Sequence, residues 1–362
     1  MQENGPVLDW AVQLLHSGGI LAIKGLGGFH LACDADNAAS VARLRQLKHR
    51  PHQPWACMAR DLQTLKKRVQ VDENEARLLQ DPARPIVILG GGQLAAMLPY
   101  TGLHELLLQQ GPELLVMTSA NPPGSPIEYR SPKAALTMAD AVLSHNRDIQ
   151  VPCDDSLAFV FRGIPTLLRR SRGFAPLPIE LPHSVEPLLA VGGELKNTFC
   201  LAQGRQAFLS QHLGDMQNLE TLEAFERCLK HFRELFQVEP QALAVDLHPA
   251  YLSRRWAERQ ELPLVEVQHH HAHLAALMVE HGFTPDEELL GFCFDGTGYG
   301  PDATVWGGEC LLASYAGYRR MAHLTPMPLV GGDSSVRSPY RLALTYLWAC
   351  QLDDRVIGCP PQ

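Results

Sequence analysis

Four histidines occupy five positions in the stretch VQHHHAHL, residues 267–274. On a helix, His269 and His273 are four residues apart and lie on one face, with β-carbons about 6 Å apart. Two imidazoles at this spacing are typical of metal-binding helices, whereas His270 and His271 are expected to be capping or surface residues. Asp295, at the end of the next predicted strand, is the nearest candidate to complete the site, because its side chain could turn back toward the helix. We therefore predict a site of His269, His273 and Asp295 for iron, zinc or manganese.

Asp295 opens a glycine-rich loop, DGTGYGPD. The loop lacks the alternating acidic ligands and the closing glutamate of a calcium-binding EF-hand. Gly296 and Gly298 suit a close approach of the backbone to a phosphate, which predicts contact with a nucleotide. The segment GGELKNT, residues 192–198, follows a predicted strand in the same way. Neither segment has the spacing of a P-loop.

Three short polar segments mark the first half of the chain: LKHRP with Lys48 and Arg50, TSANPPG with Ser119 and Asn121, and RRSRG with Arg172. Each also has a plain structural interpretation, as a solvated helix end or an ordinary turn. Cations match phosphate oxygens, and small polar groups after a buried strand lie where α/β sheets usually bind ligands. Together the segments predict a site for a nucleotide triphosphate or an acyl phosphate.

Length and composition place the chain among globular proteins. Its 362 residues, 46% apolar and 19% charged, predict about two domains. The net charge of -8 gives no general electrostatic reason to bind nucleic acid. The nine cysteines are scattered without a CxxC pair, which favours reduced thiols. With no leader peptide and no apolar run long enough to cross a membrane, we expect a cytoplasmic protein.

Strands and helices alternate over residues 1–183, which predicts an α/β domain with a twisted mixed sheet. The predicted helices cover residues 6–18, 38–50, 76–79 and 104–109, and the predicted strands cover two segments within 20–35, then 55–59, 85–89 and 113–120. A stretch with four prolines, residues 173–187, is interpreted as a semi-rigid connector between domains.

The pattern restarts in a second domain, residues 188–362. LLAVGG, NTFCLAQ and QAFLSQH predict three successive strands. A helix over 219–236, a strand at ALAVDL, a short helix, a strand at LPLVEV and the histidine helix follow. This order is that of a ribonuclease-H-like lobe. Residues 289–315 are predicted to form a further hairpin, the start of a second lobe.

These motifs resemble two known domains. LKHRP and TSANPPG match the Lys-x-Arg and Ser-x-Asn pattern of YrdC-like domains, and AIKGLGGFHLACDA, ARPIVIL, LPYTGLHELL, CDDS and RRSRG extend the match. The second half resembles the Kae-like domain of the actin and sugar-kinase superfamily, through ELKNTFCLA, LSQHLGDM, VDLHPAYLS, VQHHHAHLAA, FDGTGYGPDATVWGGE and PLVGGD. With the YrdC-like part first, the chain resembles HypF-type carbamoyltransferases of nickel-iron hydrogenase maturation. Antibiotic carbamoyltransferases carry the two domains in reverse order.

The resemblance implies a function and its residues. Lys48 and Arg50 would be catalytic and, with Ser119, Asn121 and Arg172, would line a site for ATP with Mg and for the carbamoyl group. Carbamoyl phosphate or carbamate would be converted to carbamoyl adenylate, and the carbamoyl group would pass to the C-terminal cysteine of HypE, to become the cyanide ligand of the hydrogenase iron. Family analogy adds double-stranded RNA as a candidate ligand of the YrdC-like domain.

The resemblance also implies regions that this sequence does not contain, namely an acylphosphatase-like domain, a zinc-finger region rich in CxxC and the rest of the second lobe. We therefore expect an internal fragment or a partial gene, which would start from carbamate or fail with carbamoyl phosphate. Two alternatives stay open: an O-carbamoyltransferase acting on a small-molecule hydroxyl, and a nucleotide-binding fragment without turnover.

Overall fold

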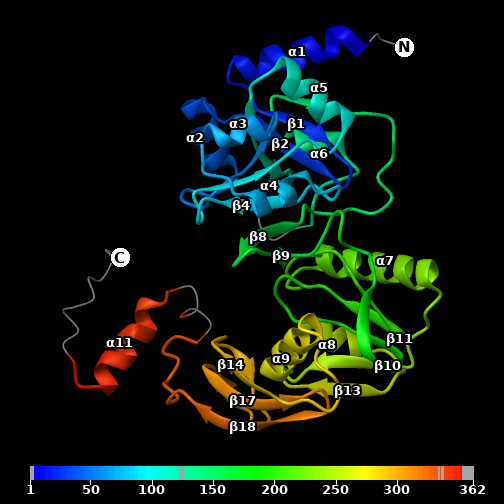
Figure 1. The fold of residues 1–362 in the computed structure, drawn as a ribbon, viewed down its shortest axis with the longest axis vertical. Helices are drawn as coiled ribbons and strands as arrows, with labels where there is room; N and C mark the ends of the chain where they lie inside the picture. Colours follow the sequence, from blue (N-terminus) through cyan, green and yellow to red (C-terminus); the bar gives the residue numbers. More distant parts are fainter. Residues whose placement is uncertain (1–3, 122–125, 333–334, 336–337, 353–362) are drawn as a thin grey trace. The chain divides into compact units, whose positions relative to one another are not determined.

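The computed structural model describes residues 4–121, 126–332, 335 and 338–352. Figure 1 shows the secondary structure of the chain. By its internal contacts the chain divides into two compact units. Unit 1 consists of Met1–Val245 with Pro249–Val265, and unit 2 of Asp246–His248 with Glu266–Gln362. The predicted domain boundary near residue 187 lies inside unit 1 and stays a prediction. Among the described helices, none combines the length and apolar character needed to cross a bilayer.

The first part of unit 1 contains a mixed sheet, as the sequence predicts, but with nine strands where the sequence indicates five. The sheet contains both parallel pairs, such as β1 with β7, and antiparallel pairs, such as β1 with β2. In spatial order the strands are β7 (Ala141–Leu143), β1 (Leu21–Lys24), β2 (Phe29–Asp34), β6 (Leu114–Ser119), β3 (Ala56–Ala59), β5 (Leu94–Met97), β4 (Ile86–Leu89), β8 (Leu157–Phe161) and β9 (Ile164–Arg169). The helices are α1 (Asn4–His16), α2 (Ala38–Leu47), α3 (Leu62–Lys66), α4 (Glu73–Gln80), α5 (Gly102–Gln110) and α6 (Pro132–Leu136).

Two cores fill the two faces of this sheet, because side chains alternate between faces along each strand. On one face α1 and α5 pack on Leu21, Ile23 and Ala32. On the other face α2, α3 and α4 pack on Ala22 and Leu31. Figure 1 shows α1 and α5 next to each other, with α2 and α3 placed apart from them. The central strands are therefore covered by helices on both faces of the sheet.

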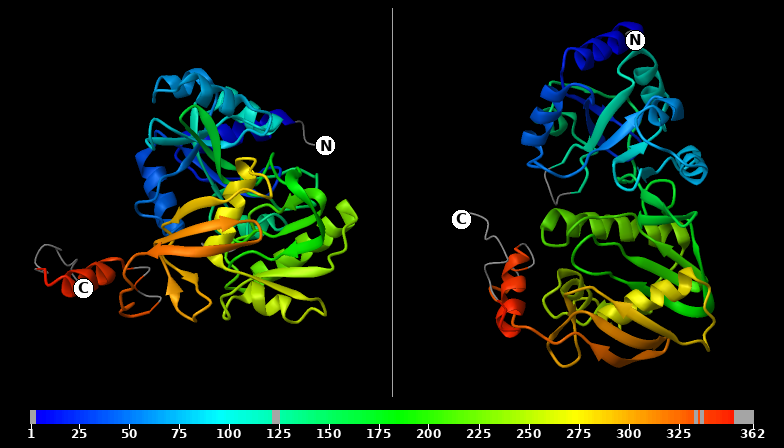
Figure 2. Two further views of the ribbon diagram at one scale, coloured as in Figure 1. Left: turned by 60° about the horizontal axis from the view of Figure 1, so that its bottom comes forward. Right: turned by 60° about the vertical axis from the view of Figure 1, so that its left-hand side comes forward.

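The second part of unit 1 contains a four-stranded sheet in the order β11-β10-β12-β13. Its elements are β10 (Ile179–Ala190), β11 (Cys200–Leu209), α7 (Leu219–Phe236), β12 (Ala242–Asp246), α8 (Leu252–Ala257) and β13 (Leu264–Val267). Helix α7 covers one face of it, and Figure 2 shows this helix lying along the sheet. Phe225 of α7 stacks edge-on against Phe199 and Trp256 at the centre of this core.

The prediction of three successive strands is wrong, because two long strands take their place. NTFCLAQ and QAFLSQH contribute to the single strand β11, which passes through Gly204 at a φ of 59° without a turn. The prediction that residues 173–187 form a connector is also wrong for its second half, which lies in β10. Pro182 and Pro187 are accommodated there because the register with β11 shifts on either side of Val185.

Unit 2 is built on an antiparallel sheet of β14 (Leu289–Cys293), β17 (Glu309–Ser314) and β18 (Gly317–His323). Helix α9 (His269–Glu280) packs on this sheet through Leu274, which contacts Cys293, Leu311 and Ala313 in one buried cluster. A ribbon of β15 (Gly298–Tyr299) and β16 (Val305–Trp306) and helix α11 (Tyr340–Ala349) complete the described part of this unit. Unit 2 therefore contains more strands than the single hairpin that the sequence predicts.

Candidate functional sites

The turn after α2 separates the side chains of Lys48 and Arg50. The amide of His49 donates to the carbonyl of Gln46 at 3.2 Å, and the amide of Arg50 donates to that of Arg45 at 3.0 Å. This is the Schellman pattern, in which the residue at the His49 position is left-handed, here with a φ of 50°. The chain reverses at His49, so Lys48 turns into the protein while Arg50 turns to a cavity.

Lys48 is a buried cation with only 4% of its surface exposed. Its ammonium donates to the carbonyl of Ser119 at 2.8 Å and to the carbonyl of Asn121. Burial, together with the charge of Arg50, lowers the pKa of Lys48 to about 8. The structure therefore brings Lys48, Ser119 and Asn121 together, with Lys48 holding the backbone of the TSANPPG segment. Pro122–Gly124 of that segment lie outside the described residues.

Arg50 and Ser119 line a cavity of about 450 Å³ beside the central strands. The Arg50 guanidinium lies over the ring of Trp55, 5.0 Å from its centroid, and donates to the carbonyl of Pro54 at 3.4 Å. Burial and the charges of Arg45 and Arg169 lower the pKa of Arg50. Within the part of the chain that the structure describes, Arg50 forms no ion pair. Its charge is therefore available to an anion in the cavity.

The cavity contains four charged or titratable residues that the sequence predictions missed: His30, Asp154, Asp155 and Arg169. His30 Nε2 and Asp155 Oδ2 lie 3.1 Å apart. Burial acts to raise the pKa of Asp155, but His30 and Arg172 outweigh it and hold that pKa well below its usual value. His30 lies in GGFH and Asp155 in CDDS, two segments that contribute to the resemblance to YrdC-like domains. Their positions in the sequence do not indicate that they pair, because they are 125 residues apart.

Arg172 has a structural position and is not among the residues lining the cavity. Its guanidinium donates to Asp155 Oδ1 at 2.8 Å and to the carbonyls of Ala83 and Arg84 at 2.8 and 2.9 Å. It also lies 3.6 Å from the centroid of the Tyr100 ring. Arg169, three residues earlier in the same segment, takes the place in the cavity that the sequence predicts for Arg172.

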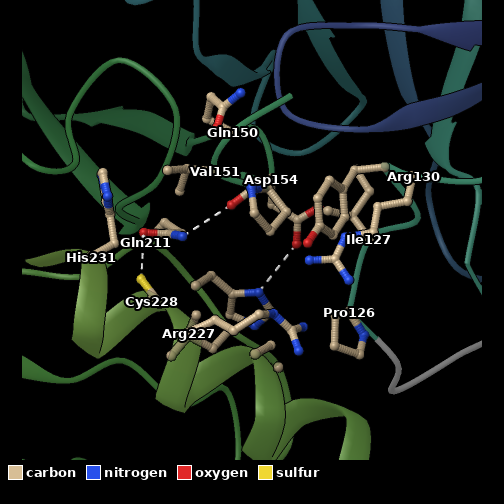
Figure 3. Close-up of a pocket in the computed structure, with 16 residues that line it drawn as sticks. Pro126, Ile127, Arg130, Gln150, Val151, Asp154, Gln211, Arg227, Cys228 and His231 are labelled. Carbon is tan, nitrogen blue, oxygen red and sulfur yellow. Dashed lines mark hydrogen bonds and ion pairs between the residues drawn. The ribbon is translucent and has the colours of Figure 1, made fainter. Parts of the chain in front are cut away.

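A second, smaller cavity of about 100 Å³ shares Asp154 with the first. Figure 3 shows Gln211 between the Val151 segment and Cys228, where its amide donates to the carbonyl of Pro152 at 3.0 Å and its oxygen accepts from the Cys228 thiol. Asp154 lies 3.2 Å from Nδ1 of His212. The buried Gln211 and the pair of Asp154 and His212 therefore already have partners within the protein.

The predicted metal ligands meet in unit 2. Oδ2 of Asp295 lies 2.8 Å from Nε2 of His269 and 3.6 Å from Nε2 of His273. All three ligand atoms lie within 4.8 Å of one another. Ligands of a tetrahedral ion with bonds of about 2.1 Å are separated by about 3.4 Å, so the three residues fit a divalent metal. Hydrogen bonds to Asp246 and Asp295 raise the pKa of His269 to about 9.

The prediction that His270 and His271 are capping or surface residues is wrong for His270. Its side chain is completely buried. Gln268, the N-cap of α9, accepts from the amide of His271 and donates to Nδ1 of His270 at 3.2 Å. Nε2 of His270 therefore carries the proton and donates to the carbonyl of Asp295 at 3.2 Å. His271 is half-buried and donates to the carbonyl of Ser314 at 2.8 Å.

The two predicted phosphate-binding glycines differ in their surroundings. A β-carbon on Gly298 would come within 2.3 Å of the His270 ring, so packing against the buried histidine accounts for this glycine. A β-carbon on Gly296 would meet nothing within 4 Å. Binding of a nucleotide by Gly296 and Gly298 stays a prediction.

Comparisons with known proteins agree on one family. Three family models match the chain: "Telomere recombination", the YrdC-like family, over residues 13–171, "HypF Kae1-like domain" over 183–280, and "Carbamoyltransferase, Kae1-like Domain, second subdomain" over 291–358. The carbamoyltransferase HypF of Synechocystis sp. is 43% identical over 97% of this chain and 48% of its own length. This chain spans about half the length of the curated relatives it matches.

Two solved structures share the fold. A crystal structure of full-length HypF in a phosphate- and nucleotide-bound form is 41% identical, with a TM-score of 0.89, over 94% of this chain and 56% of that one. The structure of HypF from T. kodakarensis is 37% identical, with a TM-score of 0.87, over 96% of this chain and 48% of that one.

The different positions of Arg172 and Arg169 lead to a stability prediction. Arg172→Gln should lower the free energy of unfolding by about 3–5 kcal/mol, because it removes the guanidinium that pairs with the buried Asp155 carboxylate. Arg169→Gln should lower it by only about 1 kcal/mol, because that side chain is one-third exposed. Urea denaturation followed by circular dichroism measures both. Equal losses in the two variants would contradict the assignment.

The histidine helix gives a second stability prediction. His270→Ala should destabilise unit 2 by about 2–4 kcal/mol, because it leaves a cavity and removes the proton donor of the Asp295 carbonyl. His271→Ala should cost about 1 kcal/mol, the value of one partly exposed hydrogen bond. Hydrogen exchange of the α9 amides provides the measurement. The interpretation fails if His271→Ala opens the helix as readily as His270→Ala.

Proposed function

The chain belongs to the HypF carbamoyltransferase family, and on that premise we propose that it forms carbamoyl adenylate and passes the carbamoyl group to a HypE-type maturation protein. The observation that carries the proposal is the cavity in which Arg50 points inward without an ion pair among the described residues, beside the buried Lys48. Arg50 presents its charge to a polyanion that arrives from solution, and Lys48 holds the neighbouring backbone carbonyls of Ser119 and Asn121 in place.

The first step joins carbamate to AMP. A carbamate oxygen attacks the α-phosphorus of ATP, bound with Mg²⁺, and the bond to the β-phosphate oxygen breaks, so that pyrophosphate leaves. Arg50 and Arg169 offset the charge on the phosphate oxygens. Lys48 holds the carbonyls of Ser119 and Asn121, which keeps this edge of the cavity in place for the substrate. No general base is required, because the attacking oxygen is already ionised.

The second step moves the carbamoyl group to sulfur. The thiolate of the C-terminal cysteine of the HypE-type partner attacks the carbamoyl carbon, the carbon–oxygen bond to AMP breaks, and a thiocarboxamide remains. His269, His273 and Asp295 would hold a divalent ion, iron or zinc, which when bound supplies Lewis-acid polarisation of a carbonyl oxygen. Further dehydration to the cyanide ligand of the hydrogenase iron belongs to the partner.

Adenylate formation is tested by ATP–pyrophosphate exchange in the presence of carbamate or carbamoyl phosphate. Arg50→Ala should lower the exchange rate by about 100-fold, because a preorganised charge on the phosphates is lost. Lys48→Ala should also abolish most of the exchange. Arg77→Ala, an exposed arginine on α4, is the matched control and should exchange like the unaltered protein. Unchanged exchange in Arg50→Ala would overturn the proposal.

The same assay should depend on pH, because Lys48 holds the carbonyls of Ser119 and Asn121 most strongly as an ammonium ion. The pKa of Lys48 is lowered to about 8, so the ammonium loses its proton as the pH rises through that value. The exchange kcat/KM for ATP reports the free enzyme, and it should fall as the pH rises above about 8. Lys48→Arg keeps its charge and should lose this alkaline limb. An alkaline limb that survives in Lys48→Arg would assign the titration to another group.

Transfer is tested separately, with a HypE-type protein as acceptor and mass spectrometry of its C-terminal peptide. His269→Ala should retain exchange but form no thiocarboxamide adduct. His281→Ala, at the other end of α9, should form the adduct normally. Carbamoylation of a sugar hydroxyl without any HypE adduct would favour an O-carbamoyltransferase. ATP binding without exchange would favour a nucleotide-binding fragment.

A further inference from the structure

Asp246 lies at the end of β12, and its carboxylate contacts the first histidine of α9. Oδ2 of Asp246 accepts a hydrogen bond from Nδ1 of His269 at 2.7 Å. Oδ1 accepts from the amide of His248 at 2.8 Å, two residues further along the chain. Only 10% of the carboxylate side chain is exposed. From this geometry we infer that Asp246 is a positioning residue that holds His269 in the tautomer and orientation required to bind a divalent metal.

The tautomer follows from which atoms are paired. An ionised carboxylate only accepts hydrogen bonds, so the proton shared with Asp246 belongs to Nδ1 of His269. In the neutral imidazole the lone pair is then on Nε2, the atom that lies 2.8 Å from Asp295. Metal-bound histidines commonly donate their second N–H to a carboxylate in this way, which fixes the ring and raises its basicity as a ligand.

The arrangement also fixes the carboxylate itself. Asp246–His248 is grouped with Glu266–Gln362 in unit 2, although β12 otherwise belongs to unit 1. Asp246 is therefore part of the same compact body as the three candidate ligands. Its two oxygens have different partners, the backbone amide of His248 and the ring of His269, so the side chain cannot rotate without breaking a hydrogen bond.

His273, the other histidine ligand, has no equivalent support. Its side chain is 57% exposed, and among the described residues Asp295 is the carboxylate within ion-pair distance of it. The site therefore contains one preorganised ligand, His269, and one adaptable ligand, His273. Most of the benefit of preorganisation should come from the bond between Asp246 and His269.

Asp246→Asn separates positioning from a merely structural role. The asparagine oxygen can still accept from the His248 amide, which keeps the turn. Its NH₂ group then faces Nδ1 of His269 and requires a lone pair there, so the proton moves to Nε2 and blocks the metal. We expect Asp246→Asn to weaken Zn²⁺ binding by about 10–100-fold, and Asp246→Ala to weaken it by a similar factor.

The measurement is competition for Zn²⁺ with a chromophoric chelator, on the whole chain, together with the visible spectrum of the Co²⁺ form. Asp302→Asn is the matched control, because Asp302 also accepts from the amide two residues on, that of Thr304, but has no hydrogen bond to a histidine among the described residues. Its Zn²⁺ affinity and Co²⁺ spectrum should match those of the unaltered protein. If Asp246→Ala does not fold, Asp246→Asn alone decides the question.

This inference rests on the proposed metal but not on carbamoyl transfer, and the outcomes distinguish the two. If the unaltered protein binds Zn²⁺ and Asp246→Asn binds it equally tightly with an unchanged Co²⁺ spectrum, the positioning role is overturned while the metal site stands. If the unaltered protein binds no metal, both are overturned. Weaker binding with a shifted Co²⁺ spectrum in Asp246→Asn, but not in Asp302→Asn, supports the inference.

Discussion

The cost of burying charge determines how the first cavity is built. Asp155 is a buried carboxylate, and a charge in that position is stable only with close partners. His30 supplies one partner from β2 and Arg172 supplies the other from beyond β9. Because Arg172 also binds the carbonyls of Ala83 and Arg84, ahead of β4, this one carboxylate ties together several strands that border the cavity.

The cost of burying charge also distinguishes the arginine that stabilises the fold, Arg172, from the arginine that is available to a ligand, Arg50. Arg172 uses its guanidinium on protein acceptors and the ring of Tyr100, and it does not line the cavity. Arg50 lies against Trp55 and its pKa is lowered by burial and by neighbouring arginines, so its charge is costly until an anion arrives. An arginine cluster in a sequence therefore does not say which member binds. The surrounding acceptors decide that.

The sequence predicts local structure well wherever a local cause operates. Pro51 limits α2, and the apolar period gives α7 its bounds of Leu219–Phe236. Sequence-based prediction fails where the local structure depends on a distant strand or on an unusual backbone conformation. Gly204 suggests a turn but extends β11, since the register with β10 absorbs its positive φ. The opposite directions of Lys48 and Arg50 depend on the left-handed His49, which no composition rule specifies.

The histidine run illustrates both cases within one helix. Helical spacing alone places His269 and His273 on one face, and the structure brings them to Asp295 as predicted. The same spacing says nothing about whether the remaining histidines meet solvent. His270 is buried because Gln268 and the Asp295 carbonyl supply partners for both of its ring nitrogens, and Gly298 leaves room for the ring. His269 and His270 therefore both contact Asp295, because His269 lies against its side chain and His270 donates a hydrogen bond to its backbone carbonyl. A candidate metal ligand and the residue that positions its neighbouring carboxylate can therefore be adjacent in sequence.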